Sequence, residues 1–498
     1  MGRVYTSEGE SDSLIIFNSS INMISKSAVG VALLVGLFSP SMVFATNGMN
    51  LEGYGAKSHA LGGASMAFDT GNSAVMNNPA TLGMMKDGQE DIGFGIRGLH
   101  PDVSAVYTSV SDKSDGNAYY MPSLSYMRKD GNIAWGAAVL AQGGMGTEYG
   151  DDSPLFSFGM SMNGAMRPMS EKEIRSEVGG GRLMFPVAWN ITPNTTIGAS
   201  LDLIWTSMDL QMDMDGRHFL GMIGGQGGSV SGSMYNSLGG MMASATDPRV
   251  EDINYVRFDF SNSSPLIGEA IGYGTGAKIG MTHRFSKVLT VGGSYHTRSW
   301  ISDLETSKAT LSFAGTGSAF SGSNPISVTG MIKVKDFEWP SIFAVGFALY
   351  PDERWMIVGD VKYMDWSTAM KKFSMSFVAD NSDSNGGFAG QILDVEMKQE
   401  WADQAVFSIG AQYKATDRLA LRAGASFSTN PVPDSYLNPL FPAITKTHYT
   451  GGFGYRITNK STIAAAFALV PKVSATSADG IAINHSQINW SLNYTHSL

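Results

Sequence analysis

The last twelve residues of the chain, Gln487-Ile-Asn-Trp-Ser-Leu-Asn-Tyr-Thr-His-Ser-Leu498, alternate as the residues of a β-strand do. Ile488, Trp490 and Leu492 would lie on one face, and the residues between them are polar. One face therefore suits lipid and the other suits a polar interior. This is the pattern of a strand in a transmembrane β-barrel.

The composition agrees with a barrel and excludes several other classes of protein. Charged residues make up only 16% of the 498 residues, against about 25% in soluble domains. The mean hydropathy of −0.04 argues against a bundle of membrane helices. A net charge of −10 argues against a nucleic-acid partner. The chain has no cysteine, which excludes disulfides and thiolate metal sites.

Tight and long connections alternate along the chain. Short periplasmic turns and long external loops alternate in this way in bacterial barrels. Thirteen connections predict an all-β, antiparallel transmembrane barrel of fourteen strands, with both ends of the barrel domain in the periplasm. The tight connections are Asp130-Gly131, Pro193-Asn194, Ser286-Lys287, Pro351-Asp352, Thr416-Asp417 and Asn459-Lys460, and the long ones span residues 101–117, 144–177, 213–269, 315–326, 380–391, 432–443 and 476–480.

The beginning of the chain predicts export. Residues 23–45 hold a basic start at Lys26, an apolar run and a small residue, Ala45, as in a cleavable signal peptide. Residues 1–22 are polar and partly acidic, so we interpret them as an extension that precedes the true start at Met23. The mature chain would then begin at Thr46.

Residues 46–90 differ from the barrel domain that we expect over residues 91–498. Glycines and Pro79 interrupt any strand pattern, and Ser58 to Phe68 is compatible with a short helix. The segment is compact and carries apolar side chains, which argues against a disordered tail. We expect a hatch, or plug, of short helices inside the barrel lumen.

The segment NLEGYGAKSHALGGASMAFDTGNSAVMNNPATLG, Asn50 to Gly83, resembles the N-terminal hatch of the FadL/TodX family of outer-membrane transporters. Its triplet Asn78-Pro79-Ala80 matches the hatch motif of that family. Further segments resemble the family in the same order along the chain. They are Ala141–Gly150, Trp339 through Trp355 and Asp360 to Asp365-Trp366-Ser367, Lys398–Asp403, and Leu421–Gly424 with Asn430–Asp434.

The resemblance implies uptake of long-chain fatty acids or aromatic hydrocarbons. Substrate would be captured in an external apolar groove, move to an internal pocket, and leave sideways through a gap at an inward kink of the third strand. Gly143, Gly144 and Gly146 are the candidate residues for the kink, because glycine within a strand often marks a bend. The alternative is that these glycines only begin the external loop.

Two further sets of candidate residues concern the ligand. The long loops are rich in methionine and other apolar residues, which would either form the external groove or pack together as a lid. Lys398 aligns with a lysine that contacts the ligand head group in the fatty-acid branch, and a solvated lysine at a strand end is the alternative. The groove candidates are Phe219, Leu220, Met222, Ile223, Met241 and Met242.

These observations predict a passive channel in the outer membrane of a Gram-negative bacterium. Long-chain fatty acids are the default substrate, monoaromatic hydrocarbons the alternative, and a general porin or an outer-membrane lipase or protease the further alternatives. No HExxH or complete GxSxG motif occurs, so we expect no enzyme, catalytic residue, metal or cofactor. The expected partners are hydrophobic small molecules and outer-membrane lipid, and the chain is expected to act as a monomer.

Overall fold

A computed structural model describes residues 47–243, 249–264 and 267–498. The expected signal peptide, the start at Met23 and the junction at Thr46 lie outside these residues. Within the described part of the chain, no helix has the length and apolar character needed to cross a membrane.

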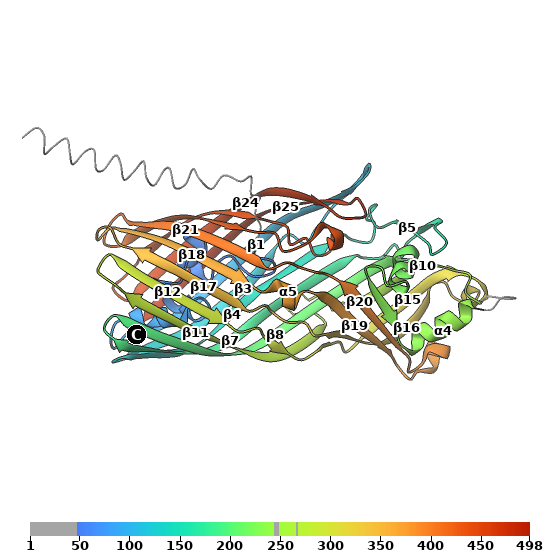
Figure 1. Ribbon diagram of the computed structural model, residues 1–498, viewed down its shortest axis with the longest axis horizontal. Coiled ribbons are helices and arrows are strands. Elements are labelled where there is room, and N and C mark those ends of the chain that lie inside the picture. The colour runs from blue at the N-terminus through green and yellow to red at the C-terminus, as the bar shows by residue number, and fades with distance from the viewer. Residues whose placement is uncertain (1–46, 244–248, 265–266) are drawn as a thin grey trace, which may run out of the picture. The chain divides into compact units, whose positions relative to one another are not determined.

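The wall of the molecule is a closed circuit of antiparallel strands, drawn lengthwise in Figure 1. Each strand pairs with the next along the circuit, and the last pairs with the first over residues 91–106 and 482–497. The wall strands are β1 (Glu90–Tyr107), β3 (Tyr119–Asp130), β4 (Ile133–Glu148), β7 (Arg175–Thr192), β8 (Thr195–Asp215), β11 (Ala270–Arg284), β12 (Leu289–His296), β17 (Ile342–Leu349), β18 (Trp355–Met364), β21 (Gln404–Lys414), β22 (Leu419–Ser428), β23 (Thr447–Arg456), β24 (Ser461–Thr476) and β25 (Ala482–Ser497).

The expectation of a fourteen-stranded fold is wrong. The described residues contain eighteen strands of eight or more residues, all in one sheet. Four of them form an external group, whereas the sequence pattern places their residues in loops or in the outer ends of other strands. They are β10 (Asp252–Phe260), β15 (Ala309–Thr316), β16 (Ile326–Lys335) and β19 (Lys372–Ala379).

The external group continues the sheet beyond one end of the wall, at the right of Figure 1. The outer end of β8 pairs with β10 and leads through β15 and β16 to β19. β10, β15 and β19 are largely buried on both faces. Their sequences still alternate, since on β19 Phe373, Met375 and Phe377 share one face, whereas Ser374 and Ser376 share the other. Alternation alone therefore does not show whether a strand belongs to the wall or to the external group. Further strands are β2 (Val110–Lys113), β5 (Phe158–Met160), β6 (Met166–Pro168), β9 (Gly228–Ser231), β13 (Trp300–Ile301), β14 (Leu304–Glu305) and β20 (Ile392–Lys398).

Helices are few and short in the described residues. Those that follow β1 in the chain are α3 (Gly216–Ile223), α4 (Ser233–Met242), α5 (Trp366–Ala369), η3 (Ser318–Phe320), η4 (Asp383–Phe388) and η5 (Asp434–Tyr436). Residues 47–89, which we call the plug, contain α2 (Gly55–Ala60), η1 (Gly71–Val75) and η2 (Pro79–Met84).

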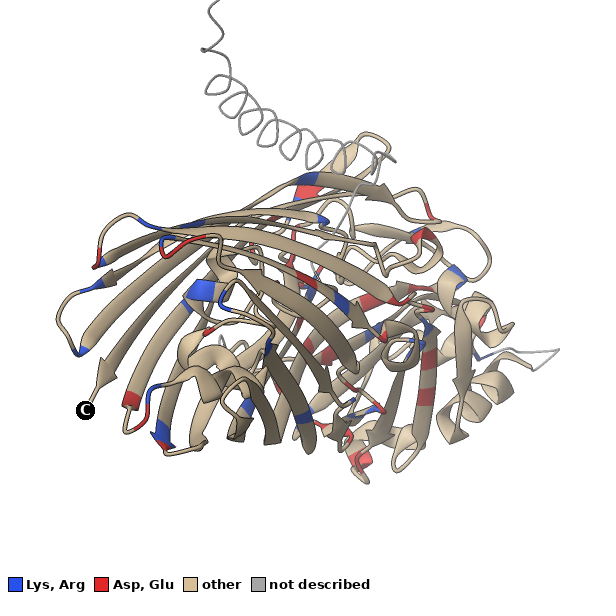
Figure 2. Cartoon of the chain, turned by 60° about the vertical axis from the view of Figure 1, so that its left-hand side comes forward, with Lys and Arg blue, Asp and Glu red and all other residues tan. Residues whose placement is uncertain are grey.

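The wall strands alternate between an apolar outer face and a small or polar inner face. On β8, Leu201 is 58% exposed, whereas its neighbours Ser200 and Asp202 are buried. The predicted alternation of β25 is confirmed, because Ile488 is exposed and Asn489 is buried. In Figure 2 charged residues gather mainly at the strand ends and turns. An outer face of this kind suits the hydrocarbon region of a membrane.

The plug is hydrogen-bonded to the wall on several sides. On one side the Asp360 carboxylate accepts a hydrogen bond of 2.6 Å from the backbone N–H of Ser65. On others, Asn493 accepts from the backbone of Ala56, and Lys129 donates to the carbonyl of Gly83. A segment without regular structure can be buried in this way only because the wall satisfies its backbone groups.

Glycines on the inner face of the wall let the plug approach closely. A Cβ atom at Gly292 would collide with the backbone of Met66, and one at Gly424 would collide with that of Gly62. Gly198, Gly280 and Gly410 meet the plug in the same way, whereas Gly359 and Gly451 contact only neighbouring wall residues.

The outer face predicts a depth-dependent penalty for charge. Leu201→Arg should destabilise the folded barrel by about 2–4 kcal/mol, because it places a cation in hydrocarbon, whereas Phe285→Arg at a turn should cost only about 0–1 kcal/mol. Phe285 is 65% exposed and therefore a matched control. The measurement is the free energy of urea unfolding in lipid bilayers. Equal penalties at both positions would contradict the assigned membrane depth.

Candidate functional site: an opening in the barrel wall

One stretch of the wall lacks strand pairing. β3 pairs with β1 over residues 119–128, but it pairs with β4 only over Leu124–Asp130. The outer half of β4, residues 140–148, pairs with β7 alone. The wall closes again beyond this point, where the backbone N–H of Asp115 donates to the carbonyl of Glu148. The result is a window between β3 and β4.

A bulge in β4 produces the window. The register with β7 shifts between Ala141 and Gly143, so Gln142 is the extra residue. The three candidate kink residues, Gly143, Gly144 and Gly146, all lie in this unpaired half of β4. The structure therefore places them within the third strand of the wall circuit, and the alternative that they only begin an external loop is wrong.

The start of the plug covers the window from inside. Asn50 forms an isolated antiparallel bridge with Gly143, and the backbone N–H of Gly144 donates to the carbonyl of Met49 at 3.0 Å. A Cβ atom at Gly143 would collide with the backbone of Met49. The plug backbone thus satisfies part of the β4 edge that β3 leaves unpaired.

Gln142 connects the bulge to both the plug and the wall. Its carbonyl accepts from the Tyr54 hydroxyl at 2.6 Å, and its amide donates to the Asn50 side chain at 3.0 Å. Its side-chain oxygen accepts from Arg182, which pairs with Asp202 at 2.8 Å. Sequence reasoning missed these residues, because only the register shift turns Gln142 toward them.

A cavity of about 350 Å³ lies at the window. Its lining includes residues of the plug, both edges of the window, and outward-facing residues of β8 such as Trp205 and Ser207. It therefore reaches from the lumen through the wall to the outer surface. Of the described residues that line it, Glu52 and Glu177 are acidic and none is Lys or Arg.

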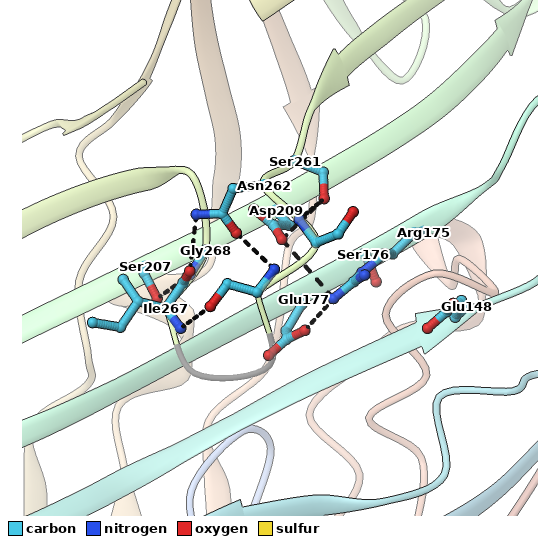
Figure 3. A network of polar contacts seen from close by, with 12 residues as sticks. Glu148, Arg175, Ser176, Glu177, Ser207, Asp209, Ser261, Asn262, Ile267 and Gly268 are labelled. Atoms are coloured by element: carbon cyan, nitrogen blue, oxygen red, sulfur yellow. Dashed lines mark hydrogen bonds and ion pairs between the residues drawn. The ribbon is translucent and has the colours of Figure 1, made fainter. Parts of the chain in front are cut away.

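The outer rim of the window carries a polar network, shown in Figure 3. Arg175 pairs with Glu177 at 2.8 Å and lies 3.9 Å from Asp209. Ser207 accepts a hydrogen bond of 3.0 Å from the backbone of Gly268, which places Ile267 on the rim. The Glu177 charge is thus already neutralised by a wall residue.

A second, smaller cavity of about 30 Å³ lies beside the first and shares Met49, Met145 and Val178 with it. Six methionines and several aromatic side chains line it, and no charged residue does among those described. Methionine side chains adapt to different apolar shapes. The shared residues form a thin apolar partition between the two cavities.

The motif Asn78-Pro79-Ala80 anchors the plug. The Asn78 side chain accepts from the backbone of Ala80 at 3.1 Å, and so caps η2. Its amide donates to the carbonyls of Met66, in the plug, and Met281, in β11. The motif is fully buried and joins two parts of the plug to the wall.

A buried ion cluster holds the plug on the side of β1 and β25. Glu52 contacts both Arg97 and His59, and His59 lies 2.8 Å from the Ser491 hydroxyl. Burial lowers the pKa of His59 to about 4. Burial alone would raise the pKa of Glu52, but the Arg97 charge and the hydrogen bond with His59 hold it well below its ordinary value. Glu52 is therefore ionised and paired.

The ligand candidates from the sequence fall into different environments. Lys398 ends β20, and the residues on either side of it, Met397 and Gln399, line the smaller cavity, whereas Lys398 lines neither cavity. Phe219 and Met222 are buried in the main apolar cluster, and Leu220 is 41% exposed. Ile223, Met241 and Met242 pack partly against that cluster. Most of these side chains are thus packed against the apolar cluster, and their use as a groove stays a prediction.

No three His, Cys, Asp or Glu side chains are grouped for a metal ion anywhere in the described residues. Two larger cavities, of about 810 and 1150 Å³, lie between the plug and the turn ends of the strands. Charged residues such as Lys57, Asp69 and Arg456 line both, so they suit water more than an apolar ligand.

Comparison with known proteins identifies the family. Residues 32–496 match the family model of the outer membrane protein transport proteins (OMPP1/FadL/TodX). The chain belongs to this family. Members of the FadL/TodX family are transport channels in the outer membrane of Gram-negative bacteria, and they carry hydrophobic molecules.

Solved members of the FadL/TodX family share the fold. The toluene transporter TodX of Pseudomonas putida is 28% identical, with a TM-score of 0.75 over 90% of this chain and 99% of its own. The toluene transporter TbuX of Ralstonia pickettii is 27% identical, with a TM-score of 0.70 over 90% and 99%. A FadL homologue of Pseudomonas aeruginosa, at 13% identity and a TM-score of 0.60 over the same shares, shows the fold alone.

One further relative carries no stated function. It is an uncharacterized protein from the phosphoenolpyruvate carboxykinase gene region of Chlorobium limicola, 54% identical over 122 residues. The match covers 24% of this chain and 59% of that protein.

Filling the window should block transport. Gly179 lines the cavity, and no other atom lies within 4 Å of the position that a Cβ atom would take there, so Gly179→Leu adds a side chain without a backbone collision. We expect uptake of a hydrophobic substrate to fall several-fold while the barrel still assembles.

Gly144→Val is a poorer test, because its Cβ would lie 2.5 Å from the carbonyl of Val178 and disturb strand pairing. Gly322→Leu, in an open external turn, is the matched control. Unchanged uptake with Gly179→Leu would remove the window from the route.

Displacing the plug should expose its first residues. Gly143→Ala introduces a methyl group that collides with the backbone of Met49 and should push Met49 and Asn50 off β4. In a Met49→Cys background the cysteine is unique, because the chain has none of its own. Maleimide should label it about tenfold faster when Gly143→Ala is added, since overpacking of this kind costs about 1–3 kcal/mol. Gly451→Ala, where the new Cβ would make ordinary contacts, should leave the rate unchanged.

Proposed function

We propose that this chain is a passive channel for small, uncharged hydrophobic molecules, with monoaromatic hydrocarbons as the substrate class. The observation that carries the proposal is the window between β3 and β4, which opens an apolar cavity through the wall of the barrel. A molecule that leaves by this route enters the membrane directly and avoids water on its way.

The route that we propose runs from the small methionine-lined cavity, past Met49 and Met145, to the cavity of about 350 Å³ at the window, and out through the window. Each step keeps the ligand in contact with apolar side chains. Leaving water for such surroundings gains about 25 cal/mol per Å² of apolar surface, so entry needs no energy source. Movement of Met49 and Asn50 away from β4 would open the passage.

The charges of the cavity favour an uncharged ligand over a fatty acid. A carboxylate would meet the acidic residues Glu52 and Glu177 and no described Lys or Arg, and burial of an unpaired charge is costly. Lys398, the candidate for the head group, lines neither cavity. The relatives TodX and TbuX are toluene transporters, which supports the same substrate class. We therefore favour the aromatic alternative over the default of long-chain fatty acids.

Transport, and not catalysis or general diffusion, is the role that we assign to the site. A general porin would need an open, charged constriction, whereas here the plug fills the lumen and hydrogen-bonds to the wall. Because the strand circuit closes within one chain, we expect the monomer to be functional.

Two molecules of the same shape test the proposal. Toluene should bind the purified protein in detergent, and 4-methylbenzoate, which carries a carboxylate, should bind at least about tenfold more weakly, because its charge would be buried without a partner. Calorimetric titration measures both. In cells, loss of the protein should slow growth on toluene and leave growth on oleate unchanged. Slower growth on oleate alone would restore the fatty-acid alternative, and no binding of toluene would reject the proposal.

A further inference from the structure

One wall of the cavity at the window, the one of about 350 Å³, is polar. His485, Gln487 and Asn489 follow each other on the inner face of β25, and all three line the cavity. Each is at least nine-tenths buried, with exposed fractions of 7%, 9% and 1%. Apolar residues of the plug and of the window edges form most of the remaining lining. A pure hydrocarbon would leave this polar stripe without a hydrogen-bond partner.

Two polar atoms of the stripe lack protein partners in the described structure. His485 Nε2 and Asn489 Oδ1 are buried without a hydrogen bond. His485 Nδ1 lies 2.9 Å from the carbonyl of Pro442, which can only accept, so Nδ1 carries the proton. In a neutral ring Nε2 is then an acceptor. Two of the three side chains therefore present acceptors.

We infer that the cavity is built for a single-ring aromatic molecule that carries a neutral hydroxyl group, which donates a hydrogen bond to the stripe formed by His485, Gln487 and Asn489. This inference rests on the proposed function, and it narrows the substrate class. Buried polar groups are usually hydrogen-bonded, and a site that leaves them unpaired discriminates against ligands that cannot pair with them. A hydroxyl supplies the donor and adds no charge beside Glu52.

The geometry of the stripe also explains how such a ligand would lie. The stripe is on β25, on the lumen side, whereas Trp205 and Ile267 belong to the outward end of the cavity. The hydroxyl would point into the lumen and the apolar ring toward the window. The ring would then lead on exit, and the hydroxyl would be the last group to leave its partners.

The test compares toluene with 4-methylphenol, which differs from it by one hydroxyl group and is uncharged at neutral pH. Calorimetric titration of the full, detergent-solubilised protein should give about tenfold tighter binding of 4-methylphenol, the gain expected from one additional buried hydrogen bond. Gln487→Leu should reduce this preference, because it removes one polar side chain of the stripe. No side-chain hydrogen bond of Gln487 is present in the described structure, so this variant is expected to fold.

Further variants keep the inference falsifiable. His485→Phe and Asn489→Leu should each reduce the preference, whereas Ser408→Ala, which removes another unpartnered hydroxyl of the lumen outside both cavities, should not. Equal binding of toluene and 4-methylphenol would overturn the inference and leave the proposed function intact. A preference that survives in all three stripe variants would overturn it as well. Failure of both compounds to bind would instead reject the proposed function.

Discussion

The whole arrangement depends on the need to pair every backbone N–H and C=O group of a wall that faces lipid. An unpaired group in hydrocarbon costs several kcal/mol, so a barrel normally leaves no strand edge open. This barrel leaves one, along the outer half of β4. The bridge from Asn50 to Gly143 and the hydrogen bond from Gly144 to Met49 show how the cost is reduced, because the plug acts as a short substitute strand.

The plug therefore has two roles that oppose each other. It must hold firmly to the rest of the wall, and Asp360, Asn493, Lys129 and the Glu52 cluster do this. Its first residues, by contrast, contact β4 through few hydrogen bonds, so they are the part that separates at least cost. The Asn78 motif hydrogen-bonds to Met281 of β11 and so holds the body of the plug to the wall.

Much of the wall can be predicted from the sequence, because alternation is a local signal. The alternation of β25 and the six tight turns have counterparts in the structure, and the glycines at residues 143–146 already stand out in the sequence as unusual. The predicted strand count is wrong because the external strands lie within segments that the sequence pattern assigns to loops or to the outer ends of longer strands. The roles of Gln142 and Arg182 could not be predicted, because a one-residue register shift reverses the direction of a side chain.

The substrate is harder to predict from the sequence than the wall, because it depends on the direction of side chains and not on local alternation. Lys398 is a candidate by its position along the chain, yet a strand residue points away from the cavity that its two neighbours line. The charge of a cavity depends on which side chains turn inward from many strands at once. Here the cavity lining contains two carboxylates, Glu52 of the plug and Glu177 of the outer rim, both paired with cations of their own, and a neutral polar stripe. Because each of these cations is already paired, the cavity offers an anion no free positive charge. Selectivity for uncharged ligands thus follows from how the charges are paired and not from their number.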